Sequence, residues 1–427
     1  MNAYARQRSS SDSWWLNSFC FARMCFAFIF VSYSAALPLL MSAWSMNATQ
    51  AGIVQSAWNL GFLVSLFSVG FLGDRFGAKR TYLWSGVAAA VSAVVFAVFS
   101  SGFVSGAILY GLAGLCSGGS YTPGLTLVAE RFAPIHRGRA MGVFLASGSL
   151  GYALSIILSS RLFPMGGWRL SFLVTGCMPA VGLLLSILVL RKTPNLVHAV
   201  SDIRAIWRSI PAVIKNRAAF LSMLAYTFHN WELLGMWAWL PAYLAYVAQA
   251  AGGAVDSAAA MEGAVLLSGV TYLTSMLGSV VGGALSDRLG RSASMMIFSC
   301  MSLFISFSFG WMAGMPLVIL FAAAAVYNFS AIADSSVYST ALTELVEPWH
   351  IGAAYAVRSV MGYGAGVISP WVFGLVIDLV SAEPLASEPL GWGLAWTCLG
   401  LGALPGPLMI WFMRMRPESL RMARGRR

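Results

Sequence analysis

The chain has 427 residues, of which 59% are hydrophobic and only 10% are charged, and its mean hydropathy is +0.76. A water-soluble domain carries roughly a quarter charged residues, so this composition excludes a soluble protein and predicts a surface that mostly faces lipid. The net charge of +11 would fit a nucleic-acid partner, but the distribution of the basic residues gives a better explanation.

Twelve apolar segments are each long enough to cross a bilayer core, which takes roughly 20 residues of helix. The sequence therefore predicts an all-α membrane protein with twelve transmembrane helices. No small-residue cleavage site follows the first apolar segment, so we expect an uncleaved span there and not a signal peptide. The predicted spans are 19–41, 51–71, 81–100, 103–129, 140–160, 169–190, 220–246, 263–285, 294–312, 316–343, 352–378 and 392–413.

The basic residues cluster in alternate connections between these spans. With the N-terminus inside, 22 of the 26 Lys and Arg residues lie in inside segments, two lie outside, and Arg23 and Arg358 fall within spans. This positive-inside pattern predicts that both termini are cytoplasmic. It also explains the net charge, because these residues face anionic lipid, and no nucleic-acid partner is expected. The short loops and the absence of a targeting peptide fit a bacterial inner membrane.

An internal repeat divides the chain into two halves. The loop GFLGDRFGAKR (70–80) after span two matches GGALSDRLGRS (282–292) after span eight, and ERFAPIHRG (130–138) after span four matches ELVEPWHIG (344–352) after span ten. Duplicated halves with a midplane site between them are a transporter architecture. We expect two pseudo-symmetric six-helix bundles at 1–190 and 220–413, a cytoplasmic central loop at 191–219, and a basic cytoplasmic tail at 414–427.

The loop GFLGDRFGAKR resembles the signature of the major facilitator superfamily, and its second copy stands where that family has one. Together with the twelve spans and the basic central loop, this resemblance covers the whole chain. It implies a secondary transporter in which Asp74 latches the two halves on the cytoplasmic side and stabilises the outward-open state. The expected gating residues are Gly70, Gly73, Asp74, Arg75, Gly77, Arg80, Glu130, Arg139, Asp287 and Arg288. Because Ser292 and Ala293 replace a basic pair, the second copy is expected to form a weaker latch.

The stretch WELLGM (231–236) also loosely resembles a subgroup of this superfamily described as nitrate/nitrite-porter-like. True nitrate porters hold the anion with an arginine in span two and another in span eight. Neither span contains an arginine here, so nitrate is not expected to be the substrate.

Two ionisable residues lie deep in span seven. Glu232 is roughly 18 Å from the start of the span at Phe220, and His229 shares its helix face. A carboxylate at this depth is too costly to face lipid, so it should face a cavity or a partner. We expect span seven to line a water-accessible cavity. An acid that is largely shielded from water within such a cavity can load and release a proton. Proton coupling, direct cation binding and simple helix packing are the three interpretations.

Span ten carries a second buried acid, and two arginines lie within spans. Asp334 is roughly 15 Å from the end of span ten, with Tyr327 and Asn328 beside it as a polar stripe. Arg358 and Arg23 either bind an anionic substrate or extend to the cytoplasmic interface. The N-terminal half offers only uncharged candidates, for which interhelical hydrogen bonds are the simpler role: Gln55, Trp58, Asn59, Tyr121 and Tyr152.

These patterns predict a secondary transporter, not an enzyme, that moves a small solute by rocker-switch alternating access. The mixed charges suit an organic anion or zwitterion, coupled to protons through Glu232 and Asp334, in a chain that works as a monomer. One alternative is a proton-antiporting exporter of drug-like or cationic compounds; another is a non-transporting receptor on the same scaffold. The six cysteines show no metal-binding spacing, and GYGAG (362–366) lies inside a span with no preceding strand, so neither a metal nor a cofactor is expected.

Overall fold

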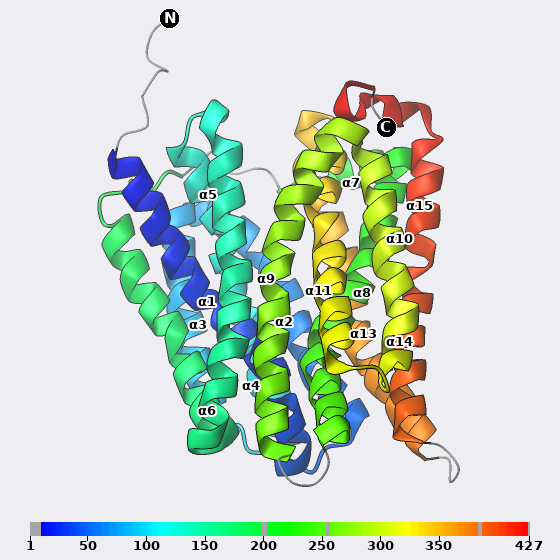
Figure 1. Ribbon diagram of the computed structural model, residues 1–427. Helices are drawn as coiled ribbons and strands as arrows, with labels where there is room; N and C mark the ends of the chain where they lie inside the picture. The colour runs from blue at the N-terminus through cyan, green and yellow to red at the C-terminus, as the bar shows by residue number, and fades with distance from the viewer. Residues whose placement is uncertain (1–9, 198–202, 253–256, 383–386, 426–427) are drawn as a thin grey trace, which may run out of the picture.

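The computed structural model describes residues 10–197, 203–252, 257–382 and 387–425, and these residues form a bundle of helices with no strand among them. The helix that begins at Ser10 and the last turns of the chain lie at the same end of the bundle (Figure 1). We call this the termini end. The opposite end, where α2 (Ala48–Phe76) begins and α13 (Ile351–Ser381) stops, is called the far end.

The helices before the central connection correspond to the first six predicted spans. They are α1 (Ser10–Ala43), α2, α3 (Ala78–Phe99), α4 (Phe103–Ser117), the short 3-10 turn η1 (Gly118–Ser120), α5 (Thr122–Arg131) and α6 (Pro134–Leu190).

The remaining helices begin with one that the sequence did not predict, since α7 (Ile203–Lys215) lies within the expected loop 191–219. The others are α8 (Arg217–Gly252), α9 (Ser257–Leu289), α10 (Arg291–Phe309), η2 (Gly310–Met312), α11 (Leu317–Ala333), α12 (Ser335–Leu345), η3 (Pro348–His350), α13, α14 (Glu388–Ala403), α15 (Pro405–Arg414) and η4 (Pro417–Gly425).

Ten helical segments among the described residues are long and apolar enough to cross a membrane. One of them covers two predicted spans, because α6 leaves helical geometry at Gly166 and Gly167. Gly167 has φ +62°, a conformation that glycine adopts without steric cost, and it separates the spans predicted at 140–160 and 169–190. The helix α8 is not among the ten, but it runs the length of the bundle and contains predicted span seven. The predicted all-α fold of twelve spans is confirmed.

Three spans are interrupted midway. Span four breaks at η1 and Tyr121, span ten breaks at Asp334 between α11 and α12, and span twelve breaks at Leu404 between α14 and α15. Breaks at membrane depth free backbone polar groups, which is tolerated where they are buried in protein or line a cavity. Two of the three breaks carry a residue that the sequence singled out, Tyr121 and Asp334.

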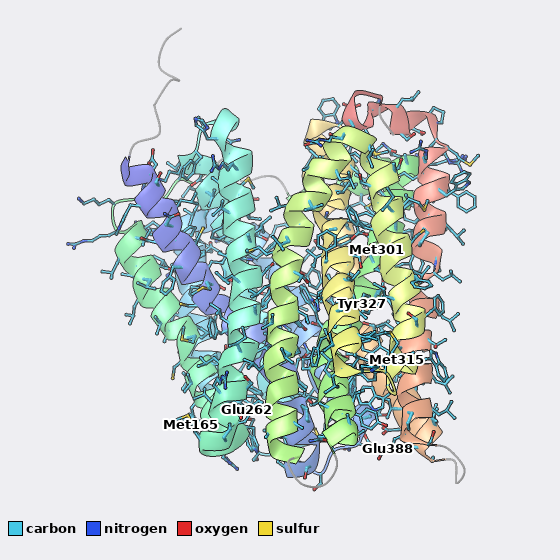
Figure 2. The ribbon with its side chains drawn as sticks, viewed as in Figure 1. Met165, Glu262, Met301, Met315, Tyr327 and Glu388 are labelled. Atoms are coloured by element: carbon cyan, nitrogen blue, oxygen red, sulfur yellow. The ribbon has the colours of Figure 1, made fainter. Side chains whose placement is uncertain are left out.

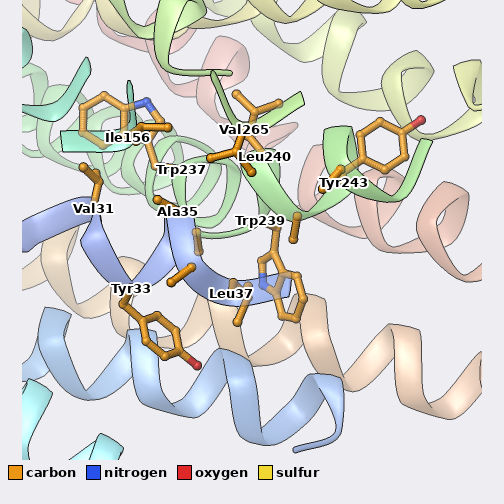
Figure 3. Packing of buried hydrophobic residues seen from close by; sticks show 14 of the residues in the cluster. Val31, Tyr33, Ala35, Leu37, Ile156, Trp237, Trp239, Leu240, Tyr243 and Val265 are labelled. Carbon is orange, nitrogen blue, oxygen red and sulfur yellow. The ribbon is translucent and has the colours of Figure 1, made fainter. Parts of the chain in front are cut away.

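At the far end, helices from the two halves of the chain pack tightly. The α2–α13 interface is close because Gly52 lies against the backbone of Pro370 and Trp371, and Gly374 lies against Ala48. The Ser34 hydroxyl of α1 donates to the carbonyl of Trp237 in α8, at 2.6 Å. Figure 3 shows the α1 and α8 side chains interleaved in this region, with Trp239 and Leu37 in the same buried cluster. The bundle therefore has a continuous core across both halves at the far end.

Candidate functional site

A cavity of about 800 Å³ opens at the termini end, between the two groups of helices. Asp74 of α2 and Trp349 of η3 line its mouth, and Leu63 and Tyr363 line its inner part. From Asp74 to Leu63 the helix rises roughly 16 Å, so the cavity extends well into the bundle. Its walls come from α2, α3, α5 and α6 on one side and α7, α8, α12, η3 and α13 on the other.

Arg358 of α13 lines this cavity and is only 7% exposed. Its Nη1 donates to the hydroxyl of Ser339 at 2.8 Å, while its Nε has no hydrogen-bond partner among the described residues. The guanidinium lies over two tyrosine rings, with its carbon 4.4 Å from the centre of Tyr226 and 4.5 Å from that of Tyr355. The side chain therefore does not extend to the interface; it is held inside the protein by aromatic rings.

Arg23 of α1 occupies a similar environment in the N-terminal half, behind the cavity wall. It is also 7% exposed, and its Nη1 donates to the carbonyl of Ser120 at 2.7 Å. Its guanidinium lies over Phe144 and over Tyr121, which itself lines the cavity. Ser120 and Tyr121 belong to the break in span four, so the interrupted helix supplies both the carbonyl and the ring that hold this arginine.

Neither arginine forms an ion pair with a carboxylate among the described residues. Burying an unneutralised charge is expensive, and the cation–π contacts compensate only part of that cost. Arg358 lines the cavity with an unused donor, so it forms a site suited to an anion that supplies the missing acceptor, and Arg23 adds a second positive charge behind Tyr121.

The predicted acids form a second, separate cluster inside the C-terminal half. Glu232 is 3% exposed, and one carboxylate oxygen accepts from the hydroxyl of Ser302 in α10 at 3.0 Å. The other oxygen has no hydrogen bond of ordinary geometry among the described residues, although Tyr327 lies next to it. Glu232 therefore faces a partner helix and not the cavity. The sequence predicts that Glu232 faces a water-accessible cavity. In the structure, α10 and α11 cover this face of α8, so the carboxylate is shielded from water.

Asp334 and His229 lie in the same buried region. The Nδ1 of His229 is 3.1 Å from the carboxylate of Asp334, and its Nε2 is 2.7 Å from the hydroxyl of Ser335. Both side chains are nearly inaccessible, with exposed fractions of 4% and 2%. Asp334 is the residue at which span ten breaks, and Ser335 follows it. Both groups that contact His229 of α8 therefore come from this break. The cluster of Glu232, His229 and Asp334 is called the buried acid cluster below.

The other two residues of the predicted polar stripe have structural surroundings. The Asn328 side chain accepts from Trp237 Nε1 at 3.1 Å and donates to Thr271 at 3.1 Å, and it is completely buried. Tyr327 lies about halfway along the bundle (Figure 2), packed against Phe309 and Trp396. Asn328 thus joins α8, α9 and α11, and it does not line the cavity.

The uncharged candidates of the N-terminal half are divided between the cavity and the core. Tyr121 lines the cavity, whereas Asn59 donates across the halves to the carbonyl of Gly366 at 2.7 Å. Gln55 is buried in α2, one turn farther toward the far end than Asn59. Trp58 packs against Tyr110, and Tyr152 packs against Phe30 and Trp237.

The expected gating loop lies at the mouth of the cavity. Gly70, Gly73 and Asp74 line the cavity, while Arg75 and Arg80 are exposed. Gly77 has φ +88°, a conformation that favours glycine, and forms a tight turn after α2. The first residues of the central connection hold this loop, because the Asn195 side chain donates to the carbonyl of Phe76 and accepts from the backbone of Arg80.

The second copy of the loop contains an ion-pair network at the termini end. Arg291 contacts Asp287 at 2.5 Å and Glu344 at 3.0 Å, and Glu344 also accepts from the backbone of Ala423. Arg288 is exposed, as is Arg139 in the first half; Glu130 is partly buried near the mouth. The network joins α9, α10, α12 and η4 within one half of the chain. Arg291 is its centre, which no sequence pattern indicated.

The contacts that close the far end are not evident from the sequence. Both carboxylate oxygens of Asp378, at the end of α13, accept backbone N–H groups at the start of α2, from Ala48 at 2.9 Å and from Thr49 at 2.7 Å. Nearby, Arg161 of α6 lies 3.3 Å from Glu262 of α9, and Figure 2 places Glu262 toward the far end. The only signal in the sequence was an acidic residue at the last position of span eleven, where it could have been an ordinary interfacial residue.

Twelve apolar spans around a cavity that opens at one end and is closed at the other define a membrane transporter. The chain belongs to the Major Facilitator Superfamily, which it matches over residues 19–333. This finding confirms the family predicted from the sequence. It also confirms the broad prediction of a multi-pass secondary transporter that is not an enzyme.

Two named transporters match most of the chain. The hexuronate transporter of Bacillus subtilis is 23% identical over 370 residues, which cover 81% of this chain and 83% of the relative. The "probable sulfoacetate transporter SauU" of Cupriavidus necator is 27% identical over 397 residues, with 88% of each chain covered. Among solved structures, a bacterial homologue of the human lysosomal transporter Spinster, in an inward-facing and occupied conformation, has a TM-score of 0.72 at 12% identity and covers 97% of this chain and 99% of its own. That similarity shows the fold alone.

Proposed function

We propose that this protein is a proton-coupled secondary transporter of small organic anions. The observation that carries the proposal is the buried, unneutralised Arg358 on the cavity wall, with a second such arginine, Arg23, behind Tyr121 of the N-terminal half. An anion bound to Arg358 in this cavity would also face Tyr121 of the N-terminal half, so it would contact both halves of the chain at once. Alternating access requires such a shared site, because the halves then close around their substrate.

The relatives support an anionic substrate. Hexuronate and sulfoacetate, which name two of the matching transporters, are both organic anions. The cavity walls add aromatic and aliphatic side chains beside the arginines, among them Phe67, Phe71 and Tyr363. A carboxylate or sulfonate attached to a small organic body would therefore place its charge at the guanidinium groups and its carbon skeleton against these walls.

We assign the proton to the buried acid cluster. Glu232 and Asp334 are carboxylic acids shielded from water, and His229 bridges from one of them to Ser335. Ionisable residues at such depth are expensive to retain and commonly serve in proton relays. The cluster lies beside the cavity and not within it, so proton and substrate would occupy neighbouring sites.

The topology follows from the same reasoning. The basic residues of the termini end predict that it is cytoplasmic, and the cavity would then be open to the cytoplasm, in a bacterial inner membrane. In this interpretation the chain functions as a monomer, with its two halves rocking about the contacts at the far end.

The proposal is tested by reconstituting the protein in liposomes that contain a pH-sensitive dye, and by adding hexuronates, sulfoacetate, amino acids, amines and inorganic anions. We expect organic anions to drive proton movement that is lost in Arg358→Gln and in Glu232→Gln. The conservative change Arg191→Lys, at an exposed position outside the cavity and the gating loop, serves as the control for insertion and expression. If amines but not anions move protons, the protein is an exporter of cations; if no solute moves, the receptor alternative is supported.

A further inference from the structure

One cavity residue contacts both candidate sites. Tyr226 of α8 lines the cavity, and its ring centre is 4.4 Å from the guanidinium carbon of Arg358. The same ring stacks on the imidazole of His229, with the ring centres 5.8 Å apart and the planes inclined by 30°. These two distances place the guanidinium and the imidazole at most about 10 Å apart. Tyr226 is thus the side chain through which the anion site contacts the buried acid cluster.

The helix register explains this arrangement. Tyr226 precedes His229 by three residues, so the two side chains share one face of α8. On the neighbouring helix, Gly362 follows Arg358 by four residues and leaves room for the tyrosine; a methyl group there would lie 2.6 Å from Tyr226 Cε1. The ring is therefore held between its own helix and the α13 backbone, where it cannot shift without affecting a neighbour.

We propose that Tyr226 couples anion binding at Arg358 to protonation of the buried acid cluster. This inference rests on the proposed function and deepens it. The groups around the imidazole are the acids Asp334 and Glu232, the hydroxyl of Ser335, the ring of Tyr338 and, across the Tyr226 ring, the Arg358 guanidinium.

A bound anion affects the buried acid cluster through the charge on Arg358. Without substrate, the positive Arg358 occupies the π system of Tyr226, so the ring is less available to a second cation on its other side. A substrate carboxylate neutralises Arg358 and weakens its hold on the ring, which then becomes available to the imidazolium. Bound anion and bound proton therefore favour each other, and by linkage the effect is equal in both directions. Because the ring contact lies in a desolvated part of the protein, where a cation–π interaction is strongest, the coupling through Tyr226 amounts to roughly a tenfold change in affinity.

The chain supplies a matched control in Tyr355. Its ring lies 4.5 Å from the same guanidinium and it also lines the cavity. However, its hydroxyl donates to the carbonyl of Ser339 and contacts Thr343, away from His229. Removal of either ring weakens the support of Arg358, but only removal of Tyr226 breaks the contact with the imidazole.

The experiment compares two assays on reconstituted protein with D-glucuronate and sulfoacetate as probe anions. Exchange of labelled anion at equal pH measures anion binding and movement, and uptake driven by a pH gradient measures coupling. We expect Tyr226→Leu to keep exchange within a few-fold of wild type while gradient-driven accumulation falls roughly tenfold, because the cation–π contact is lost. Tyr355→Leu should lower both activities together, and Tyr226→Phe, which retains the ring, should preserve coupling and show that the site folds.

The outcomes separate this inference from the proposed function. Tyr226→Leu with undiminished gradient-driven accumulation would overturn the role of Tyr226 and leave the proton-coupled anion transporter intact. Loss of exchange and accumulation in equal proportion in Tyr226→Leu, with normal Tyr226→Phe, would make the residue part of the anion site only. If the wild-type protein exchanges neither probe anion, the proposed function fails and the inference fails with it.

Discussion

At the scale of single residues, the two buried arginines differ in how directly they reach the cavity. Arg358 lines it, whereas Arg23 lies behind Tyr121. Both retain an Nε without a partner among the described residues. An arginine in such a position offers a planar pair of donors that matches a carboxylate, which the single ammonium group of lysine cannot reproduce. The distinction between the two arginines should be visible in conservative substitutions.

We therefore predict that Arg358→Lys weakens anion binding more than Arg23→Lys does. Loss of one charge-assisted hydrogen bond costs about 2 kcal/mol, or roughly thirtyfold in affinity, for the residue in direct contact. For Arg23 the expected loss is only a few-fold, because Tyr121 lies between it and the cavity. The half-saturating concentration for exchange of labelled anion measures both. Equal losses in the two variants would contradict the assignment of Arg358 as the contacting residue.

Asn328 illustrates a residue that the sequence placed in a candidate site and the structure places in the packing. Its amide joins Trp237 and Thr271 in a fully buried network. We predict that Asn328→Ala lowers the free energy of unfolding by about 2 kcal/mol, because it leaves the indole N–H unpaired and opens a small void. Thermal unfolding in detergent measures this. Thr340→Ala, which removes an exposed bond within one helix, is the control and should change stability little.

A coupling defect in Asn328→Ala without a loss of stability would restore the original functional interpretation. Identical stability losses in the two variants would show that the network contributes no more than an exposed hydroxyl does.

At the scale of helices, sequence patterns predicted the spans well and the interruptions poorly. Hydropathy identified twelve spans because each is about as long as the bilayer is thick. Hydropathy is insensitive to a break within an apolar run, so the interruptions at Tyr121 and Asp334 were not predicted. The break at Asp334 nevertheless supplies the two groups that contact His229, Asp334 itself and Ser335.

The candidate site shows the same division. Glu232, His229 and Asp334 stood out because a charge in an apolar run is rare, and the structure does bring them together. Tyr226 did not stand out, since a tyrosine in a span is common and only its neighbours on α13 give it significance. Ser302 was likewise indistinguishable from other small residues until α10 packed against α8. Partners contributed by other helices were beyond the reach of local patterns.

The contact between α13 and α2 gives a prediction at this scale. Asp378 accepts two N–H groups at the start of α2, where the helix dipole favours a negative charge. Asp378→Asn removes the charge and one acceptor but keeps the size of the side chain. We expect it to destabilise closure of the far end by about 1.5 kcal/mol, roughly a tenfold shift toward states open at that end. Distances between spin labels on α2 and α13 at the far end measure the shift.

The ion pair of Arg161 and Glu262 provides the comparison for Asp378. It also joins two helices at the far end, but Arg161 is 63% exposed, and an exposed pair of this kind contributes little. Glu262→Gln should therefore leave the distribution of distances almost unchanged. A larger shift from Glu262→Gln than from Asp378→Asn would indicate that the α6–α9 contact, and not the helix cap, holds this end closed.

At the scale of the whole molecule, the structure is asymmetric along its length. The termini end is open, with a cavity reaching from Asp74 to Leu63, and the far end is sealed by Gly52, Gly374 and Asp378. For an alternating-access transporter these are the features of one of two states. The reverse state requires the far-end contacts to separate and the gating loop around Asp74 to approach α13.

This asymmetry predicts which positions a water-soluble thiol reagent can reach from each side of the membrane. In a variant without the native cysteines, Leu63→Cys lies on the cavity wall and should react from the termini side, whereas Ala51→Cys, completely buried at the far end, should be protected. Adding Asp378→Asn should increase the reactivity of Ala51→Cys from the far side and decrease that of Leu63→Cys, because the two openings compete for one population of molecules. Reactivity that rises at both positions together would mean that the substitution loosens the bundle, and rocking between two states would then not describe this protein.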